Sequence, residues 1–229
     1  RNVAVYEGVV LTPTQVCRNI RALLLSISQS HPFIQMAHDD KELVHSGLLI
    51  SMTRRRQRLP RRVTWVMPPS GCVKLNIDGS SLGNPGPSGT GGVLRDSDGT
   101  ILSGFSSFLG LMTNMEAEAL ALLEGMRISA GFHCLHVEMD SQVLMRMVTG
   151  NGSIPWKLWS TISRIKTIAL GRQVTFTHTY REANAVADAL ANLASSTHVC
   201  QRFSPSQIPE YIKGLARLDK LQMPYVRLA

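Results

Sequence analysis

The sequence lacks the segments that would place it in or across a membrane. Its 229 residues contain no uninterrupted apolar run of about 18 residues, the length that a membrane-spanning helix requires. No basic segment followed by an apolar one opens the chain, so there is no secretory signal to read. We therefore expect an intracellular protein that is not secreted and has no membrane partner. The chain begins with Arg1 rather than Met, which is compatible with a fragment of a longer protein but does not decide the question.

Cysteine is scarce, and its spacing excludes the common zinc sites. None of the four cysteines belongs to a CxxC pair, and they lie far apart at Cys17, Cys72, Cys134 and Cys200. This usage favours a reduced compartment. The glycine-rich stretch GNPGPSGTGG (83–92) is not followed by GK[ST], which excludes a phosphate-binding P-loop.

Acidic residues are also few. The 16 Asp and Glu residues are outnumbered by 24 Lys and Arg, and the resulting formal charge of +8 suits an anionic partner such as nucleic acid. Six of the arginines fall between Thr53 and Arg62, just before the proline-containing stretch 67–71. We interpret this run as a solvated linker or a localisation signal, which favours the nucleus; a grip on nucleic acid is the alternative.

The pattern divides the chain into three parts. Residues 1–71 are expected to form a partly helical N-terminal extension and an arginine-rich linker, with a helix over 16–27 capped by Thr14. Residues 72–197 alternate strand and helix signals as an α/β domain does. Residues 198–229 have little periodicity and are expected to form a C-terminal tail.

Within 72–197 the predicted order is β-β-β-α-β-α-α-β-α. The second and third strands are joined by Ser97, Asp98 and Gly99, a short hairpin signal. The first helix begins with the T-x-x-E spacing of a capping box, at Thr113 and Glu116. The strands are predicted over 73–78, 91–96, 100–108, 135–140 and 174–180, and the helices over 113–130, 141–148, 154–170 and 182–195.

Two aspartates, Asp78 and Asp140, each end an alternating strand. They would emerge side by side if their strands were a parallel pair joined by the helix over 113–130, because such a pair needs a long crossover. Clustered carboxylates repel one another, so a persistent cluster usually holds a hard cation. Magnesium is the natural candidate.

Four motifs in this order resemble ribonuclease H of type 1: DGSSLGNPGPSGTGGVL (78–94), TNMEAEALALLEGM (113–126), VEMDSQ (137–142) and HTYREANAVADALA (178–191). The resemblance covers roughly 72–196 and is nearest to the plant domain found in retrotransposon-derived reverse transcriptase proteins. It implies a mixed five-stranded sheet flanked by helices.

The resemblance places the family's metal ligands on Asp78, Glu118, Asp140 and Asp188. Periodicity alone does not choose among the glutamates of the helix, since Glu116 lies about 160° around the axis from Glu118 and Glu124 is also a candidate. The family pattern selects Glu118. Glu116 then has the capping role.

The same resemblance implies hydrolysis of the RNA strand of a DNA/RNA hybrid with two Mg²⁺ ions, or Mn²⁺, and an assisting histidine at His178. Asn184 falls at the family's supporting asparagine, and we group it with the substrate-binding residues. The other implied substrate contacts are Ser80, Asn84, Thr113, Asn114 and Gln142.

Two departures from the family support an alternative function. Met115 stands where the family often has a second asparagine, and the short spacing from Asp140 to His178 leaves no room for the basic protrusion of longer bacterial enzymes. The alternative is a catalytically weak or inactive nucleic-acid-binding module. A protein-interaction domain is a third, weaker reading.

Overall fold

The structure is a computed structural model that describes residues 12–16, 18–20, 22 and 60–227. The chain divides into two compact units, Arg1–Arg58 and Leu59–Ala229. In the first unit, residues 13–16 and 18–20 are helical. The cap predicted at Thr14 is instead formed by Thr12, whose hydroxyl accepts a hydrogen bond from the Gln15 N–H at 3.4 Å. Most of the arginine run, residues 54–59, lies outside the described residues.

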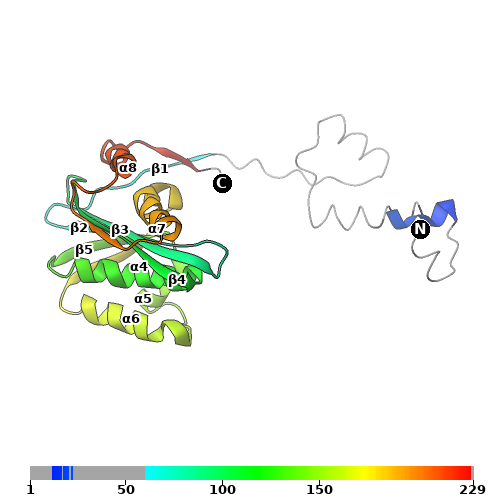
Figure 1. Ribbon diagram of the computed structural model, residues 1–229, viewed down its shortest axis with the longest axis horizontal. Coiled ribbons are helices and arrows are strands. Elements are labelled where there is room, and N and C mark those ends of the chain that lie inside the picture. The colour runs from blue at the N-terminus through cyan, green and yellow to red at the C-terminus, as the bar shows by residue number, and fades with distance from the viewer. Residues whose placement is uncertain (1–11, 17, 21, 23–59, 228–229) are drawn as a thin grey trace. The chain divides into compact units, whose positions relative to one another are not determined.

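The second unit is built on a mixed six-stranded sheet with the order β6-β5-β2-β3-β4-β7 (Figure 1). Strands β2, β3, β4 and β7 pair antiparallel, whereas β2, β5 and β6 pair parallel. Five strands were expected, and β7 corrects that number. The bounds are β2 (Val73–Ser81), β3 (Gly86–Arg95), β4 (Ile101–Met112), β5 (Cys134–Met139), β6 (Gln173–His178) and β7 (Gln201–Phe203).

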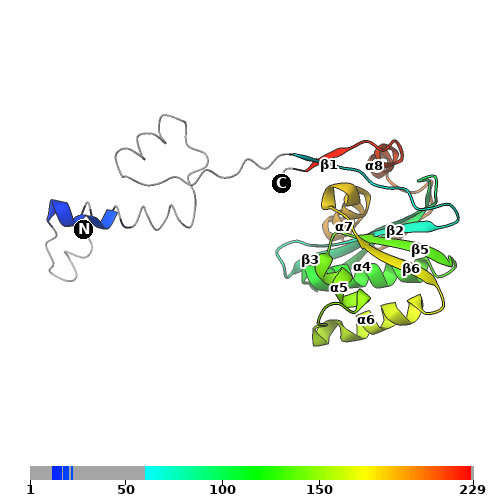
Figure 2. The ribbon, with the colours of Figure 1, turned by 180° about the vertical axis from the view of Figure 1, so that it is seen from behind.

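Helices cover both faces of the sheet (Figures 1 and 2). On one side lie α4 (Asn114–Ile128), α5 (Gln142–Thr149) and α6 (Trp156–Ala169). On the other side lies α7 (Ala185–Thr197), which follows the short 3₁₀ helix η1 (Arg181–Asn184). Helix α7 packs closely on β3, because a Cβ atom on Gly91 of β3 would lie 2.2 Å from the backbone nitrogen of Ala191 on α7. Two apolar cores result, one on each face.

The local signals of the sequence are confirmed where they depend on neighbouring residues. Thr113 and Glu116 form a complete capping box at the start of α4. The hairpin between β3 and β4 turns at Gly99, whose φ of +73° is in the region that glycine favours.

The chain on either side of the expected domain is part of the same unit, contrary to the boundaries at 72 and 197. Strand β1 (Arg61–Val63) pairs antiparallel with β8 (Tyr225–Arg227). The expected tail contains β7, α8 (Glu210–Lys220) and β8, and it contributes Ile208 and Ile212 to the apolar core around α7. The structured unit therefore extends well beyond the expected domain.

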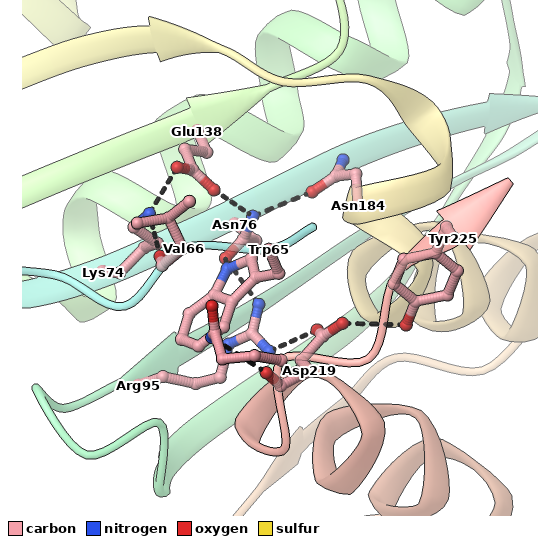
Figure 3. Close-up of polar contacts among 10 residues, drawn as sticks. Trp65, Val66, Lys74, Asn76, Arg95, Glu138, Asn184, Asp219 and Tyr225 are labelled. Carbon is pink, nitrogen blue, oxygen red and sulfur yellow. Dashed lines mark hydrogen bonds and ion pairs between the residues drawn. The ribbon is translucent and has the colours of Figure 1, made fainter. Parts of the chain in front are cut away.

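A buried polar network ties these flanking segments to the sheet (Figure 3). Arg95 on β3 forms an ion pair with Asp219 on α8, at 2.6 Å, and both side chains are 1% exposed. Asp219 also accepts a hydrogen bond from the Tyr225 hydroxyl at 2.8 Å. The Trp65 ring lies under the Arg95 guanidinium and donates its Nε1–H to Asn76 Oδ1 at 3.0 Å. The flanks are thus joined to β2 and β3 by directed contacts.

One cysteine pair differs from the expectation of scattered thiols. Cys72 directly precedes β2, and Cys134 begins the neighbouring parallel strand β5. A disulfide joins the two cysteines. Sequence spacing could not reveal this pair, because the pairing of β2 with β5 brings the two residues together. Among the described helices, none is long and apolar enough to cross a membrane.

Candidate active site

Parallel pairing of β2 and β5 brings Asp78 and Asp140 together. Asp140 directly follows β5, but the expected strand end at Asp78 is wrong, because β2 continues to Ser81 through its pairing with β3. Asn76 on β2 is opposite Glu138 on β5, so Asp78 and Asp140 lie two residues further along neighbouring strands. Helix α4 crosses β2 at this level and adds Glu118. Carboxylate oxygens of Asp78, Glu118 and Asp140 all lie within 4.8 Å of one another. We call these three residues the carboxylate cluster.

Some carboxylate oxygens of the cluster have no hydrogen-bond partner among the described residues. Asp78 and Glu118 are buried, with 5% and 4% of their surface exposed. Within the described part of the chain, Glu118 Oε2 and Asp140 Oδ1 are buried atoms without a hydrogen-bond partner. Buried carboxylate oxygens without donors are costly unless a cation or a proton compensates them. Several hard oxygen ligands in one place suit Mg²⁺ or Mn²⁺.

Burial and mutual repulsion raise the pKa values of the acids in the cluster. Burial raises the pKa of Asp78 well above its ordinary value, and the charges of Asp140 and Asp188 raise it further. The pKa of Glu118 is likewise raised, first by burial and then by Asp78 and Asp140. The pKa of Asp140 is raised by burial, against the opposing charge of Arg181. Without a cation the cluster therefore favours protonated forms.

Asp188, the fourth expected ligand, is hydrogen-bonded to Arg181, which was not among the expected site residues. Arg181 donates two hydrogen bonds to Asp188 Oδ1, from Nε at 2.9 Å and from a terminal nitrogen at 2.5 Å. Asn192 donates to the other carboxylate oxygen at 2.9 Å. Asp188 is close enough to raise the pKa of Asp78. The basic residue within HTYREANAVADALA was the available signal for Arg181.

Asn184 is a buried framework residue, which corrects its grouping with substrate contacts. It is 1% exposed, and its Nδ2 donates to the Ile77 carbonyl at 2.8 Å. Its Oδ1 accepts from Asn76 Nδ2 at 3.1 Å (Figure 3). Asn184 immediately precedes α7, so these bonds fix the start of that helix, and hence Asp188, against β2 beside Asp78.

His178 ends β6 and is opposite Met139, the residue before Asp140. It therefore lies at the same edge of the sheet as the cluster. The Tyr180 ring packs edge-on against it, with ring centres 5.7 Å apart. The imidazole is only partly buried, so it has access to solvent.

The remaining expected substrate residues fall into two groups. The Asn114 N–H at the start of α4 donates to Asn84 Oδ1 at 2.9 Å, so the loop between β2 and β3 (82–85) is attached beside the capping residue Thr113. Gln142 is exposed at the start of α5. Ser80 differs, since its hydroxyl is bonded to the Ala191 carbonyl and to Ser195, each at 3.0 Å. Ser80 therefore joins β2 to α7 and has less freedom to contact a ligand.

A second group of metal-ligand types, Cys72, Cys134 and His136, also has ligand atoms within 4.8 Å of one another. Its two sulfur atoms are bonded to each other. The carboxylate cluster is therefore the better candidate for a cation.

Comparison with known proteins agrees with this geometry. Residues 76–194 match a family described as reverse transcriptase-like. The chain is 35% identical over 182 residues to a candidate ribonuclease H protein of Arabidopsis thaliana, covering 77% of this chain but only 29% of that relative. It is 34% identical over 169 residues to ribonuclease HI of Halobacterium salinarum, covering 69% of this chain and 77% of the relative.

Solved structures show the same fold. Ribonuclease H1 of Halobacterium salinarum superposes with a TM-score of 0.52 at 34% identity, covering 54% of this chain and 97% of the other. A second ribonuclease H1, LC11, was solved in complex with an RNA/DNA hybrid. It gives a TM-score of 0.52 at 30% identity and covers 55% and 98% of the two chains.

Proposed function

The chain belongs to the type 1 ribonuclease H family, in its reverse transcriptase-like branch, and we propose that it is an endonuclease that hydrolyses the RNA strand of DNA/RNA hybrids. We further propose that it derives from a retroelement. The carboxylate cluster carries this proposal, because its unpartnered buried oxygens and raised pKa values call for a bound cation.

The chain's own residues have separable roles in this reaction. Asp78, Glu118 and Asp140 would hold the cations, and Asp188 would complete the set when Arg181 turns away from it. Two bound Mg²⁺ or Mn²⁺ ions would supply an activated water and stabilise the leaving 3′ oxygen. The imidazole of His178, at the neighbouring strand end, would assist proton transfer.

Substrate would be held where α4 begins. Its first backbone N–H groups and the attached loop between β2 and β3 form a surface suited to phosphate, and Asn84, Thr113 and Asn114 lie there. Gln142 would extend this surface from the start of α5. RNA would be distinguished from DNA by contacts to 2′-hydroxyl groups.

A second candidate function is a nucleic-acid-binding module without turnover. It is favoured by the Arg181–Asp188 pair, which satisfies one of the four expected ligands within the chain. Met115 in place of the family's asparagine points the same way. Such a module would bind hybrid with strong salt dependence and leave it intact.

The deciding experiment is hybrid cleavage by the purified chain with Mg²⁺ or Mn²⁺. We expect the RNA strand to be cut, duplex DNA to be spared, and Asp78→Asn to abolish cutting. Asp98→Asn, in the exposed hairpin turn, is the matched control and should retain activity. Intact hybrid with the wild-type chain, at concentrations where binding is measured, would reject the enzyme and leave the module.

A further inference from the structure

Helix α6 exposes two tryptophans to solvent. Trp156 is 83% exposed and Trp159 is 64% exposed, whereas Trp65, the third tryptophan of the chain, is 1% exposed. The opposite side of α6 is well packed, through Leu158, Ile162 and Ile165. The helix is therefore anchored without its indoles. Exposed large aromatic side chains that anchor nothing mark an interaction surface.

The segment that contains this helix carries one sign of charge. From 141 to 181 the sequence contains six Lys and Arg residues and no Asp or Glu, so every formal charge of this segment is positive. On α6 itself Lys157, Arg164 and Lys166 are exposed. Within the described ranges none of these three forms an ion pair with a carboxylate. A partner for this surface should be anionic.

The charges and the indoles share one side of the helix. Trp159 and Lys166 are seven residues apart, as are Lys157 and Arg164, so each pair forms a row along the axis. At about 100° per residue the two rows flank Trp156 on the side opposite to Leu158. Ser160, Ser163 and Thr167 fill the strip between the rows and are exposed. We call Trp156, Trp159, Lys157, Arg164 and Lys166 the α6 surface.

The α6 surface begins near the proposed substrate site. Hydrogen bonds from the Thr113 backbone and hydroxyl lower the pKa of Glu116, and the charge of Lys157 also contributes. The starts of α4 and α6 are therefore close. Beyond the end of α6, Arg172 donates to the carbonyl of Ser129, just past the end of α4, at 2.6 Å. The two helices thus run side by side in the same direction (Figure 1).

We propose that the α6 surface binds single-stranded nucleic acid, as an accessory site for an unpaired strand that continues from the hybrid. Exposed indoles stack on bases, and paired bases inside a duplex are already stacked on their neighbours. Lysine and arginine on either side would neutralise the phosphates between stacked bases. The proposal goes beyond cleavage, because binding of an unpaired strand needs no catalysis.

A protein partner fits this surface less well. A helix docked in an apolar groove presents apolar residues at i, i+3, i+4 and i+7. The exposed side of α6 has apolar groups only at Trp156 and Trp159, in its first turn, and continues with Ser160, Ser163 and Thr167. The absence of acidic residues from 141 to 181 also matches phosphate better than a protein surface of mixed charge.

The test uses the Asp78→Asn chain without divalent cation, so that no cleavage interferes, and measures fluorescence anisotropy with three labelled probes. These are a blunt hybrid, the same hybrid with a single-stranded extension, and the single strand alone. We expect the extension to tighten binding. Trp156→Ala with Trp159→Ala should weaken binding of the extended hybrid and the single strand by about tenfold or more and leave the blunt hybrid unchanged.

Matched variants separate stacking from charge and from folding. Trp156→Phe with Trp159→Phe should retain part of the affinity, because phenylalanine also stacks. Lys157→Gln, Arg164→Gln and Lys166→Gln should lower the slope of log affinity against log salt by about 0.7 per charge removed. Tyr211→Ala with Arg217→Gln places the same kinds of change on exposed positions of α8 and should alter nothing.

Indole fluorescence supplies a readout that a structural role would not move. Since Trp65 is buried, quenching by an unlabelled single strand would report on Trp156 and Trp159, and their replacement should remove it. Equal affinity of the wild-type and Trp156→Ala, Trp159→Ala chains for the extended hybrid overturns the proposal. Conversion of a dimer to a monomer by that variant also overturns it, in favour of contact between copies. Failure of wild-type cleavage with tryptophan-dependent binding retained would reject only the proposed enzyme.

Discussion

The backbone nitrogen of Glu118 lies 2.3 Å from the position that a Cβ atom would take on Gly79. Helix α4 therefore rests directly on the backbone of β2, one residue after Asp78. Only glycine permits this approach, and the approach brings the Glu118 carboxylate to the Asp78 carboxylate. The same contact therefore packs α4 on β2 and assembles the carboxylate cluster.

Replacing Gly79 by alanine should disturb both the packing of α4 on β2 and the carboxylate cluster. The added methyl group would overlap the backbone of Ala117 and Glu118, which cannot move like a flexible side chain, so we expect a loss of about 1–3 kcal/mol or more in the free energy of unfolding. Urea denaturation measures this. Gly131→Ala is the control, because a Cβ atom there meets nothing within 4 Å. Equal stability of the two variants would contradict the close contact.

Glu116 and Glu118 should separate stability from activity although they are two residues apart. Glu116→Ala removes the capping box and should cost about 1 kcal/mol of unfolding free energy without affecting catalysis. Glu116→Gln should retain most of that stability, because its amide oxygen still accepts the Thr113 N–H bond. Glu118→Gln should abolish hybrid cleavage while the fold persists. Thermal unfolding and a cleavage assay on all three variants check the assignment, which fails if Glu118→Gln remains active.

The pH dependence of stability without metal should have a specific sign. The folded pKa values of Asp78 and Glu118 are raised, mainly by burial, so the folded chain retains protons that the unfolded chain loses above about pH 4. Unfolding free energy in EDTA should therefore fall as pH rises from about 4 toward the raised folded pKa values.

Asp78→Asn provides the comparison. At neutral pH in EDTA this variant should be more stable than the wild-type chain and its stability should fall less with pH, because one buried charge is gone. Mg²⁺ or Mn²⁺ should raise the unfolding temperature of the wild-type chain more than that of the variant. A stability of the metal-free wild-type chain that rises over this pH range would contradict the repulsive cluster.

The Arg95–Asp219 pair should make the C-terminal helix essential to the domain. Asp219→Ala leaves the Arg95 guanidinium buried without its partner and should cost about 3–5 kcal/mol. Replacing both residues by leucine should recover part of the loss, since the uncompensated charge is then absent. Glu210→Gln, on the exposed side of the same helix, is the control and should leave the unfolding midpoint unchanged. Denaturant unfolding of the wild-type chain and the three variants measures these differences.

Much of the site was predictable because its signals are local or periodic. Alternation placed Asp78 on a strand and Asp140 directly after one, and the capping spacing assigned Glu116 its role at the start of α4. The resemblance to the family, rather than periodicity, selected Glu118 for the cluster. The parallel pairing of β2 and β5 is the arrangement that the helix between them allowed and that the meeting of the two aspartates required. The burial of Asn184 was not predictable, because its partners Asn76 and Ile77 are more than 100 residues away in sequence.

The sequence by itself determined the order of strands and helices and the α/β class, because alternation, capping and turn chemistry act between near neighbours. Only the tertiary structure decided that β7, α8 and β8 belong to the domain, that Cys72 meets Cys134, and that Arg181 holds Asp188. Each of these depends on surfaces that exist only after the sheet has formed. The exposure of Trp156 and Trp159 belongs with them, since only the packed face of α6 shows which side of the helix remains available.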